Sequence, residues 1–103
     1  MTERTKKQPH QCKNLQDLRN EIDSIDIQIL DLLKERFEYV MEVPKYKQKD
    51  AESIIAIDRK QSVIRTRADW AKERGLSGEV IGKIYEQLVN YFIEEEMKTI
   101  KQS

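Results

Sequence analysis

The stretch that decides the fold is LQDLRNEIDSIDIQILDLLKERFEYV, residues 15–40. Its apolar side chains recur at intervals of three or four residues, which is the spacing of one face of an α-helix. Continued to residue 43, the series comprises Leu15, Leu18, Ile22, Ile25, Ile29, Leu32, Tyr39 and Val43, with Arg36 in one of the apolar places. The pattern therefore predicts one long helix whose apolar face carries a single arginine.

Local signals place the ends of this helix. Asn14 is a typical N-cap because its side chain accepts hydrogen bonds from backbone N–H groups of the first turn, and Asp17 three residues on adds to the signal. Pro44 should end or kink the helix near Val43, because proline lacks an N–H and clashes with the preceding turn. Residues 45–52 are then a charged connection.

Two shorter helices are expected after the connection. The first covers residues 53–74, and Gly75 suits its C-terminal stop. One face of it is formed by Ile57, Ile64, Ala68 and Ala71. Ser77 is expected to cap a third helix, whose apolar residues run from Val80 to Ile100. Gly (3) and Pro (2) are scarce, which favours long helices over a turn-rich β fold. The predicted fold class is all-α, a three-helix subunit with a long first helix.

The domain organisation follows from the same pattern. Residues 1–13 are polar and without period, so they are expected to be a flexible N-terminal tail before a helical domain of residues 14–103. A first helix of roughly 30 residues would be about 45 Å long. A globule of this chain length is only about 26–30 Å across. Two shorter helices could not cover such a long apolar face, so we expect a second copy to cover it in a homodimer.

Composition excludes several classes of function. Lys plus Arg and Asp plus Glu both number 19, so a protein that coats nucleic acid or an anionic membrane is not expected. The absence of a long apolar run or signal segment makes a cytoplasmic location the default. Cys12 is the one cysteine and His10 the one histidine, and there is no Gly-rich phosphate loop. We therefore expect no disulfide within the chain, no metal site and no cofactor.

Candidate site residues are polar groups on apolar faces. A guanidinium buried there needs an anionic partner. Arg36 therefore either forms an internal salt bridge, extends its charged end to solvent, or binds a carboxylate ligand through its guanidinium fork. Lys47 lies about three turns beyond Arg36, and Glu96 points to the apolar side of its helix; either could be purely structural. Arg19 precedes Arg36 by 17 residues, about 25 Å along a helix. If both serve one site, Arg19 must reach the site of a partner chain.

Residues 15–40 and the following KYK, residues 45–47, resemble the first helix of the all-helical chorismate mutases. Within that family the chain is most similar to the isochorismate pyruvate-lyase branch, which makes salicylate for siderophores. The features that carry this likeness are Cys12 before the first helix, WAKERGL (residues 70–76) and LVNYFIEEEMK (residues 88–98). The resemblance implies an intertwined homodimer with shared sites and a dianionic substrate, isochorismate or chorismate.

The resemblance also implies a role for each candidate residue. Arg19 would bind a substrate carboxylate in the other subunit's site, and Arg36 would bind the second carboxylate. Lys47 would contact the ether oxygen and a carboxylate. Arg59 stands where the family places another substrate-facing arginine. Glu96 would be the second group facing the ether oxygen.

The chain departs from the family pattern at two places, Glu96 and Lys60. Many members have glutamine at the position of Glu96, and a glutamate donates a hydrogen bond only when protonated, which requires a raised pKa or an acidic medium. Lys60 stands where chorismate mutases usually carry a glutamate that holds the C4 hydroxyl. Isochorismate has its hydroxyl elsewhere, so this loss fits the lyase branch. Pro44 shortly before Lys47 could alter how that lysine closes over the ligand.

Three functional hypotheses result. The first is an isochorismate pyruvate-lyase that forms salicylate and pyruvate in a pericyclic reaction and has weak chorismate mutase activity. The second is a chorismate mutase that forms prephenate. The third is a non-catalytic helical dimer whose basic residues only form salt bridges.

Overall fold

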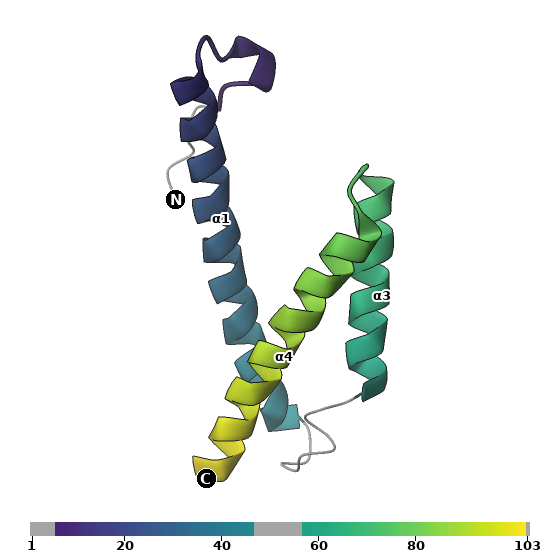
Figure 1. The fold of residues 1–103 in the computed structure, drawn as a ribbon. Coiled ribbons are helices and arrows are strands. Elements are labelled where there is room, and N and C mark those ends of the chain that lie inside the picture. Colours follow the sequence, from purple (N-terminus) through teal and green to yellow (C-terminus); the bar gives the residue numbers. More distant parts are fainter. Residues whose placement is uncertain (1–5, 47–56, 103) are drawn as a thin grey trace. The chain divides into compact units, whose positions relative to one another are not determined.

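A computed structural model of the chain describes residues 6–46 and 57–102, with side chains to residue 99. These ranges hold three α-helices and two short 3-10 helices and contain no strand (Figure 1). In chain order the elements are η1 (Pro9–Gln11), α1 (Leu15–Glu42), η2 (Val43–Tyr46), α3 (Ile57–Glu73) and α4 (Gly78–Gln102). The all-α prediction is confirmed. The chain divides into two compact units, Met1–Glu38 and Tyr39–Ser103.

The start of α1 is capped as the sequence indicates. The Asn14 side-chain oxygen accepts a hydrogen bond from the Asp17 backbone N–H at 2.8 Å. The Asn14 carbonyl accepts one from the Leu18 N–H at 3.3 Å. An asparagine at this position satisfies a backbone donor that has no partner within the helix. The predicted N-cap is therefore confirmed.

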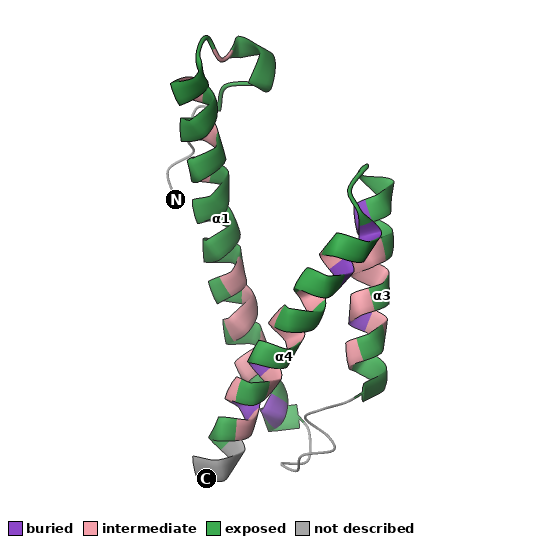
Figure 2. Cartoon of the chain, in the orientation of Figure 1, coloured by how far each residue is buried: buried purple, intermediate pink, exposed green. Residues whose placement is uncertain are grey.

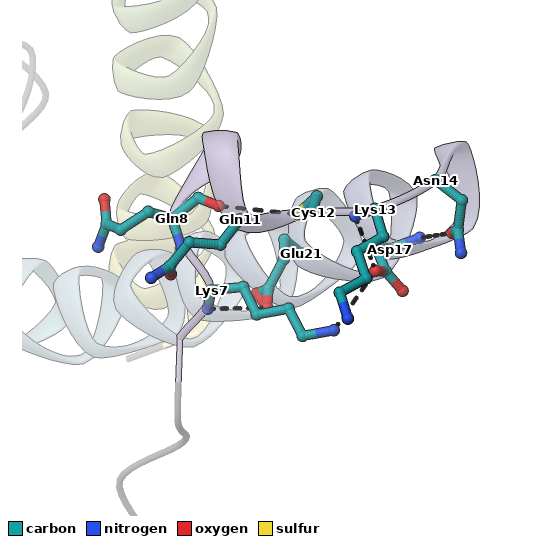
Figure 3. Close-up of polar contacts among 8 residues, drawn as sticks. All are labelled: Lys7, Gln8, Gln11, Cys12, Lys13, Asn14, Asp17 and Glu21. Carbon is teal, nitrogen blue, oxygen red and sulfur yellow. Dashed lines mark hydrogen bonds and ion pairs between the residues drawn. The ribbon is translucent and has the colours of Figure 1, made fainter.

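Residues 6–13, called here the N-terminal hook, fold back beside the first turns of α1 (Figure 3). The Lys7 backbone N–H donates to Glu21 Oε1 at 3.2 Å. Asp17 Oδ2 accepts the Lys13 backbone N–H at 3.1 Å and pairs with Lys7 Nζ at 3.4 Å. These contacts tie the hook to α1. Its flexibility in solution and a domain boundary at residue 13 stay predictions.

Pro44 ends the long helix. α1 stops at Glu42, and Val43–Tyr46 continues as one 3-10 turn in which Pro44 is buried. The missing N–H and the ring of proline are compatible with a helix terminus but not with a helix interior. The predicted end near Val43 is confirmed. Of the connection predicted over residues 45–52, residues 47–52 lie outside the described ranges.

The apolar face of α1 stays largely in contact with solvent. No residue of α1 is buried (Figure 2). Leu15 is 59% exposed, Ile22 55% and Leu32 63%. Isolated exposed leucines are common, but a row of them along one helix face marks a surface that associates with something else.

A tight turn joins α3 to α4. Gly75 adopts φ +78°, a left-handed conformation that costs glycine little. The Leu76 N–H bonds to the Ala71 carbonyl at 2.9 Å and the Gly75 N–H to the Lys72 carbonyl at 3.1 Å, which is the Schellman pattern of a helix end. Ser77 Oγ then accepts the Val80 N–H at 3.1 Å and caps α4. Both predicted signals, the stop and the cap, are confirmed.

Small residues let α3 and α4 approach closely just after this turn. A Cβ at Gly78 would lie 2.9 Å from the Ala68 carbonyl oxygen, whereas one at Gly82 would lie 3.7 Å from Ala68 Cβ. Further along, the buried apolar side chains are Val63, Ala71 and Phe92. Ile57, one of the four residues predicted to share a face of this helix, is 63% exposed, whereas Val63, which was not among them, is buried.

No helix within the described ranges has both the length and the apolar character needed to span a membrane.

We predict that Gly78→Ala and Gly82→Ala act in opposite directions. The Gly78 methyl meets a backbone oxygen, so the helices must separate, at a cost of about 1–3 kcal/mol in the free energy of unfolding. The Gly82 methyl makes ordinary contacts, and alanine should stabilise the helix by about 0.5–1 kcal/mol. Urea unfolding followed by circular dichroism, at one protein concentration, measures both. Equal effects would contradict the close approach at Gly78.

We also predict that acid releases the N-terminal hook. The Lys13 backbone N–H and the Lys7 ammonium hold the pKa of Asp17 below its ordinary value of 3.8, against the opposing effect of partial burial. The contact therefore stabilises the hook above pH ~4 and is lost as the pH falls through the lowered pKa. Amide exchange at Lys13 should accelerate on acidification relative to the intrinsic rate, and at neutral pH in Asp17→Ala. Asp23→Ala is the control, and it should leave Lys13 unchanged.

Candidate active site

Arg19 and Arg36 share one unbroken helix. α1 runs from Leu15 to Glu42 without interruption. The 17 intervening steps separate the two residues by about 25 Å and turn their side chains roughly 100° apart. Because that distance exceeds the reach of a small ligand, one chain cannot offer both guanidinium groups to the same molecule. If both arginines bind one ligand, they must therefore come from two copies of the chain.

The two arginines differ in environment. Arg19 is exposed, near the N-terminus of α1. Arg36 is half-buried, and so are Leu33, Phe37 and Val40 around it. A guanidinium among apolar side chains interacts more strongly with an anion than one in water, because the surrounding dielectric constant is lower. Arg36 therefore has the setting of a strong carboxylate ligand, whether that carboxylate is internal or external.

Glu96 is the one charged residue classed as buried in the described part of the chain, with 5% of its surface exposed. It lies on α4 one turn after the buried Phe92, whose ring packs against Tyr91 at 5.3 Å between centroids. The prediction that Glu96 faces the apolar side of its helix is confirmed. Burial of a carboxylate costs several kcal/mol unless a hydrogen bond or a cation compensates it. Glu94, Glu95 and Glu96 form an acidic run, and in a run that only faces solvent no member would be buried as Glu96 is.

Arg59 and Lys60 lie in the first turn of α3, where Arg59 is exposed and Lys60 half-buried. α3 and α4 are antiparallel neighbours joined at Gly75 (Figure 1). The start of α3 and the last turns of α4 therefore lie at the same end of the pair, away from the turn. This places Arg59, Lys60 and Glu96 toward one end of the unit Tyr39–Ser103.

The assignment of these residues to one site stays a prediction. Lys47 lies outside the described residues. Arg19 and Arg36 belong to the unit Met1–Glu38, whereas Arg59 and Glu96 belong to Tyr39–Ser103. Each residue is characterised within its own unit.

Sequence reasoning did not single out Arg67. Its guanidinium carbon lies 4.5 Å from the centroid of the Trp70 ring and 6.0 Å from that of Tyr85 on α4. Arg67 Nη1 also donates to Thr66 Oγ1 at 3.0 Å. The spacing of Arg67 and Trp70 by three residues was a visible signal, but the contact with α4 depends on the packing. The interaction holds α3 to α4 and lies away from Glu96.

The chemistry available is that of cations and one buried acid. Guanidinium groups bind carboxylates through paired N–H donors, and a protonated carboxyl can donate a hydrogen bond to an oxygen. Within the described ranges no group of three His, Cys, Asp or Glu side chains is placed to hold a metal ion. Such a set of groups suits the binding and polarisation of a small anionic molecule.

Comparison with known proteins identifies the family. Residues 18–97 match the model of chorismate mutase type II. The chain is 33% identical to an isochorismate pyruvate lyase of Pseudomonas aeruginosa, with 94% of this chain and 95% of that protein covered. It is also 33% identical to a T-protein of Haemophilus influenzae, with 79% of this chain but 20% of that protein covered. These matches indicate an enzyme, and they show that the chain belongs to the chorismate mutase type II family.

Proposed function

We propose that the chain is an isochorismate pyruvate-lyase that converts isochorismate to salicylate and pyruvate, with a weaker chorismate mutase activity. The observation that carries the proposal is the similarity to the Pseudomonas aeruginosa lyase along nearly the full length of both proteins. We further propose that the reaction takes place in the cytoplasm and supplies salicylate for siderophore synthesis.

The reaction is pericyclic, so bonds reorganise in one step and the atoms of isochorismate are divided between the two products. Neither a nucleophile nor a cofactor is required. The enzyme must hold a reactive conformer and stabilise the negative charge that grows on the ether oxygen as its C–O bond breaks. Orientation can contribute several kcal/mol, and positioned donors add electrostatic stabilisation. Cationic and hydrogen-bonding side chains therefore suffice.

Each candidate residue has a role in this scheme. Arg36 holds one substrate carboxylate, and Arg19 of the partner subunit holds the other. Arg59 is a further substrate-facing cation. Lys47 and the protonated Glu96 donate to the ether oxygen. The half-burial of Arg36 and the burial of Glu96 support these roles, because both groups act more strongly away from water.

The site requires a homodimer. The long exposed apolar face of α1 supports this assembly, because a second α1 is a surface of the same length and character. The separation of about 25 Å between Arg19 and Arg36 supports it independently, because antiparallel pairing of two α1 helices brings Arg19 of one copy toward Arg36 of the other.

Chorismate mutase is the second candidate, and the family match over residues 18–97 favours it. The two candidates differ at Lys60, where the resemblance implies a glutamate in the mutases. Purified protein incubated with each substrate separates the possibilities by product. Salicylate and pyruvate from isochorismate support the lyase, and prephenate alone supports the mutase. No turnover of either substrate supports a non-catalytic helical dimer.

We predict that Arg36→Ala leaves the protein folded but lowers kcat/KM by on the order of a hundred- to a thousandfold, because a positioned cation for a substrate carboxylate is lost. Turnover of isochorismate and sedimentation of the variant measure the two effects. Lys34→Ala, an exposed cation on the same helix, is the matched control. Near-normal activity of Arg36→Ala would discard Arg36 as a substrate ligand.

We predict that Glu96→Gln extends activity toward neutral pH. Glutamate donates to the ether oxygen only when protonated, so wild-type turnover should fall as rising pH removes that proton. Glutamine donates without titrating and should not show this fall. Profiles of kcat against pH for both proteins provide the measurement, with Glu95→Gln as the neighbouring control. Superimposable profiles would mean that Glu96 does not titrate in the working range.

A further inference from the structure

The N-terminal hook and the second half of α1 carry opposite charges on the surface. At the start, the N-terminal hook presents exposed basic groups and contains no acidic residue: Lys6, Lys7, His10 and Lys13. The second half of α1 carries an exposed acidic stripe, formed by Asp31, Glu35, Glu38 and Glu42. The spacings of four, three and four residues keep the stripe within roughly 60° of the helix surface.

The hook and the acidic stripe lie on the same flank of α1. The hook is held by the carboxylates of Asp17 and Glu21 (Figure 3). Asp17 and Glu35 are 18 residues apart, about five turns, so their side chains point in the same direction. The shortest separation between a residue that holds the hook and the stripe, from Glu21 to Asp31, is about 15 Å along the helix. The hook therefore cannot contact the acidic stripe of its own chain.

The basic groups of the hook are available to a partner. Asp17 and Glu21 already accept the backbone N–H groups of Lys13 and Lys7. The Lys7 side chain, which pairs with Asp17, remains 53% exposed. Its outward charge is thus not fully neutralised.

On the acidic stripe, Glu42 pairs with Lys45 at the very end, and both side chains are more than half exposed. Lys34 borders the stripe, whereas Arg36 lies on the apolar face. The centre of the stripe, at Glu35 and Glu38, is exposed.

Two-fold symmetry brings the hook and the stripe together. In an antiparallel pair of α1 helices, the first turns of one copy lie beside the last turns of the other. The symmetry axis also puts the same flank of both helices on the same side of the pair. We propose that the N-terminal hook of each copy docks on the acidic stripe of the other, which forms two equivalent clasps across the dimer. The inference rests on the homodimer of the proposed function and adds a contact outside the substrate site.

The lone cysteine provides a direct test, because Cys12 belongs to the hook. In Glu35→Cys the new thiol lies about 30 Å along the helix from its start, so a disulfide within one chain is impossible, since its Cα atoms must lie within about 7 Å. Mild oxidation should give covalent dimers as the main species on a non-reducing gel. Lys34→Cys, turned about 100° around the helix, and Glu35→Cys with Cys12→Ser should both stay mainly monomeric on that gel.

A charge exchange provides an independent measurement. Lys6→Glu with Lys13→Glu should raise the dimer Kd by about three- to tenfold at low salt and by less at high salt, because exposed charge pairs are weak and screened. Adding Glu35→Lys and Glu38→Lys to the same chain should restore the Kd. Sedimentation equilibrium measures these values.

The outcomes separate this inference from the proposed function. Covalent dimers from Glu35→Cys, together with rescue by the charge exchange, establish the clasp. Two results would overturn the clasp and leave the proposed function intact. In the first, the dimer turns over isochorismate but Glu35→Cys forms no disulfide with Cys12. In the second, the charge reversals leave the dimer Kd unchanged. If the hook binds an anionic polymer and Glu35→Cys forms no covalent dimer, the clasp is also overturned. A stable monomer overturns both the clasp and the shared site.

Discussion

The proposed assembly depends on one constraint, the long apolar face of α1 that the single chain leaves exposed. α1 is about 42 Å long, and none of its residues is buried within the single chain. Removing apolar surface from water contributes roughly 25 cal/mol per Å² to the free energy of association. An exposed apolar face of this length therefore strongly favours association with a partner. The charged residues on its flanks cannot supply a force of that size, because exposed ion pairs contribute little. These flanking charges can, however, determine the orientation of the partner helix.

The same constraint bears on the positions of the residues that we propose to act on the substrate. A polar side chain on a face that becomes buried is desolvated by the assembly itself, without a deep cavity in the monomer. Arg36 is the example on α1, half-buried already in one chain. On α4, Glu96 follows Phe92 by one turn and is buried already within one chain. A pericyclic reaction requires orientation and polarisation rather than bond-forming residues, so a helical assembly with desolvated cations is well suited to it.

Local signals correctly predicted four of the helix ends in the described residues. Asn14, Pro44, Gly75 and Ser77 act through contacts within a few residues, so the sequence around each contains what is needed. Tertiary details were less accessible. On α3, Val63 is buried and Ile57 is exposed, a difference that periodicity alone did not predict. The hook escaped prediction because its bond to Glu21 comes from a backbone N–H 14 residues away. For the site, spacing identified Arg36 and Glu96 as unusual, but their roles came from the family resemblance.

The proposed roles of α1 in assembly and in substrate binding are compatible, because the faces that carry them are separated by angle. Arg19 lies between Asp17 and Glu21 in the sequence, yet two residues turn the helix by roughly 200°. The hook, held by the two carboxylates, therefore occupies one side of α1 while Arg19 projects from nearly the opposite side. The apolar face lies between them on the helix surface. In the proposed dimer, docking of the hook on the partner would therefore leave Arg19 free to reach a ligand.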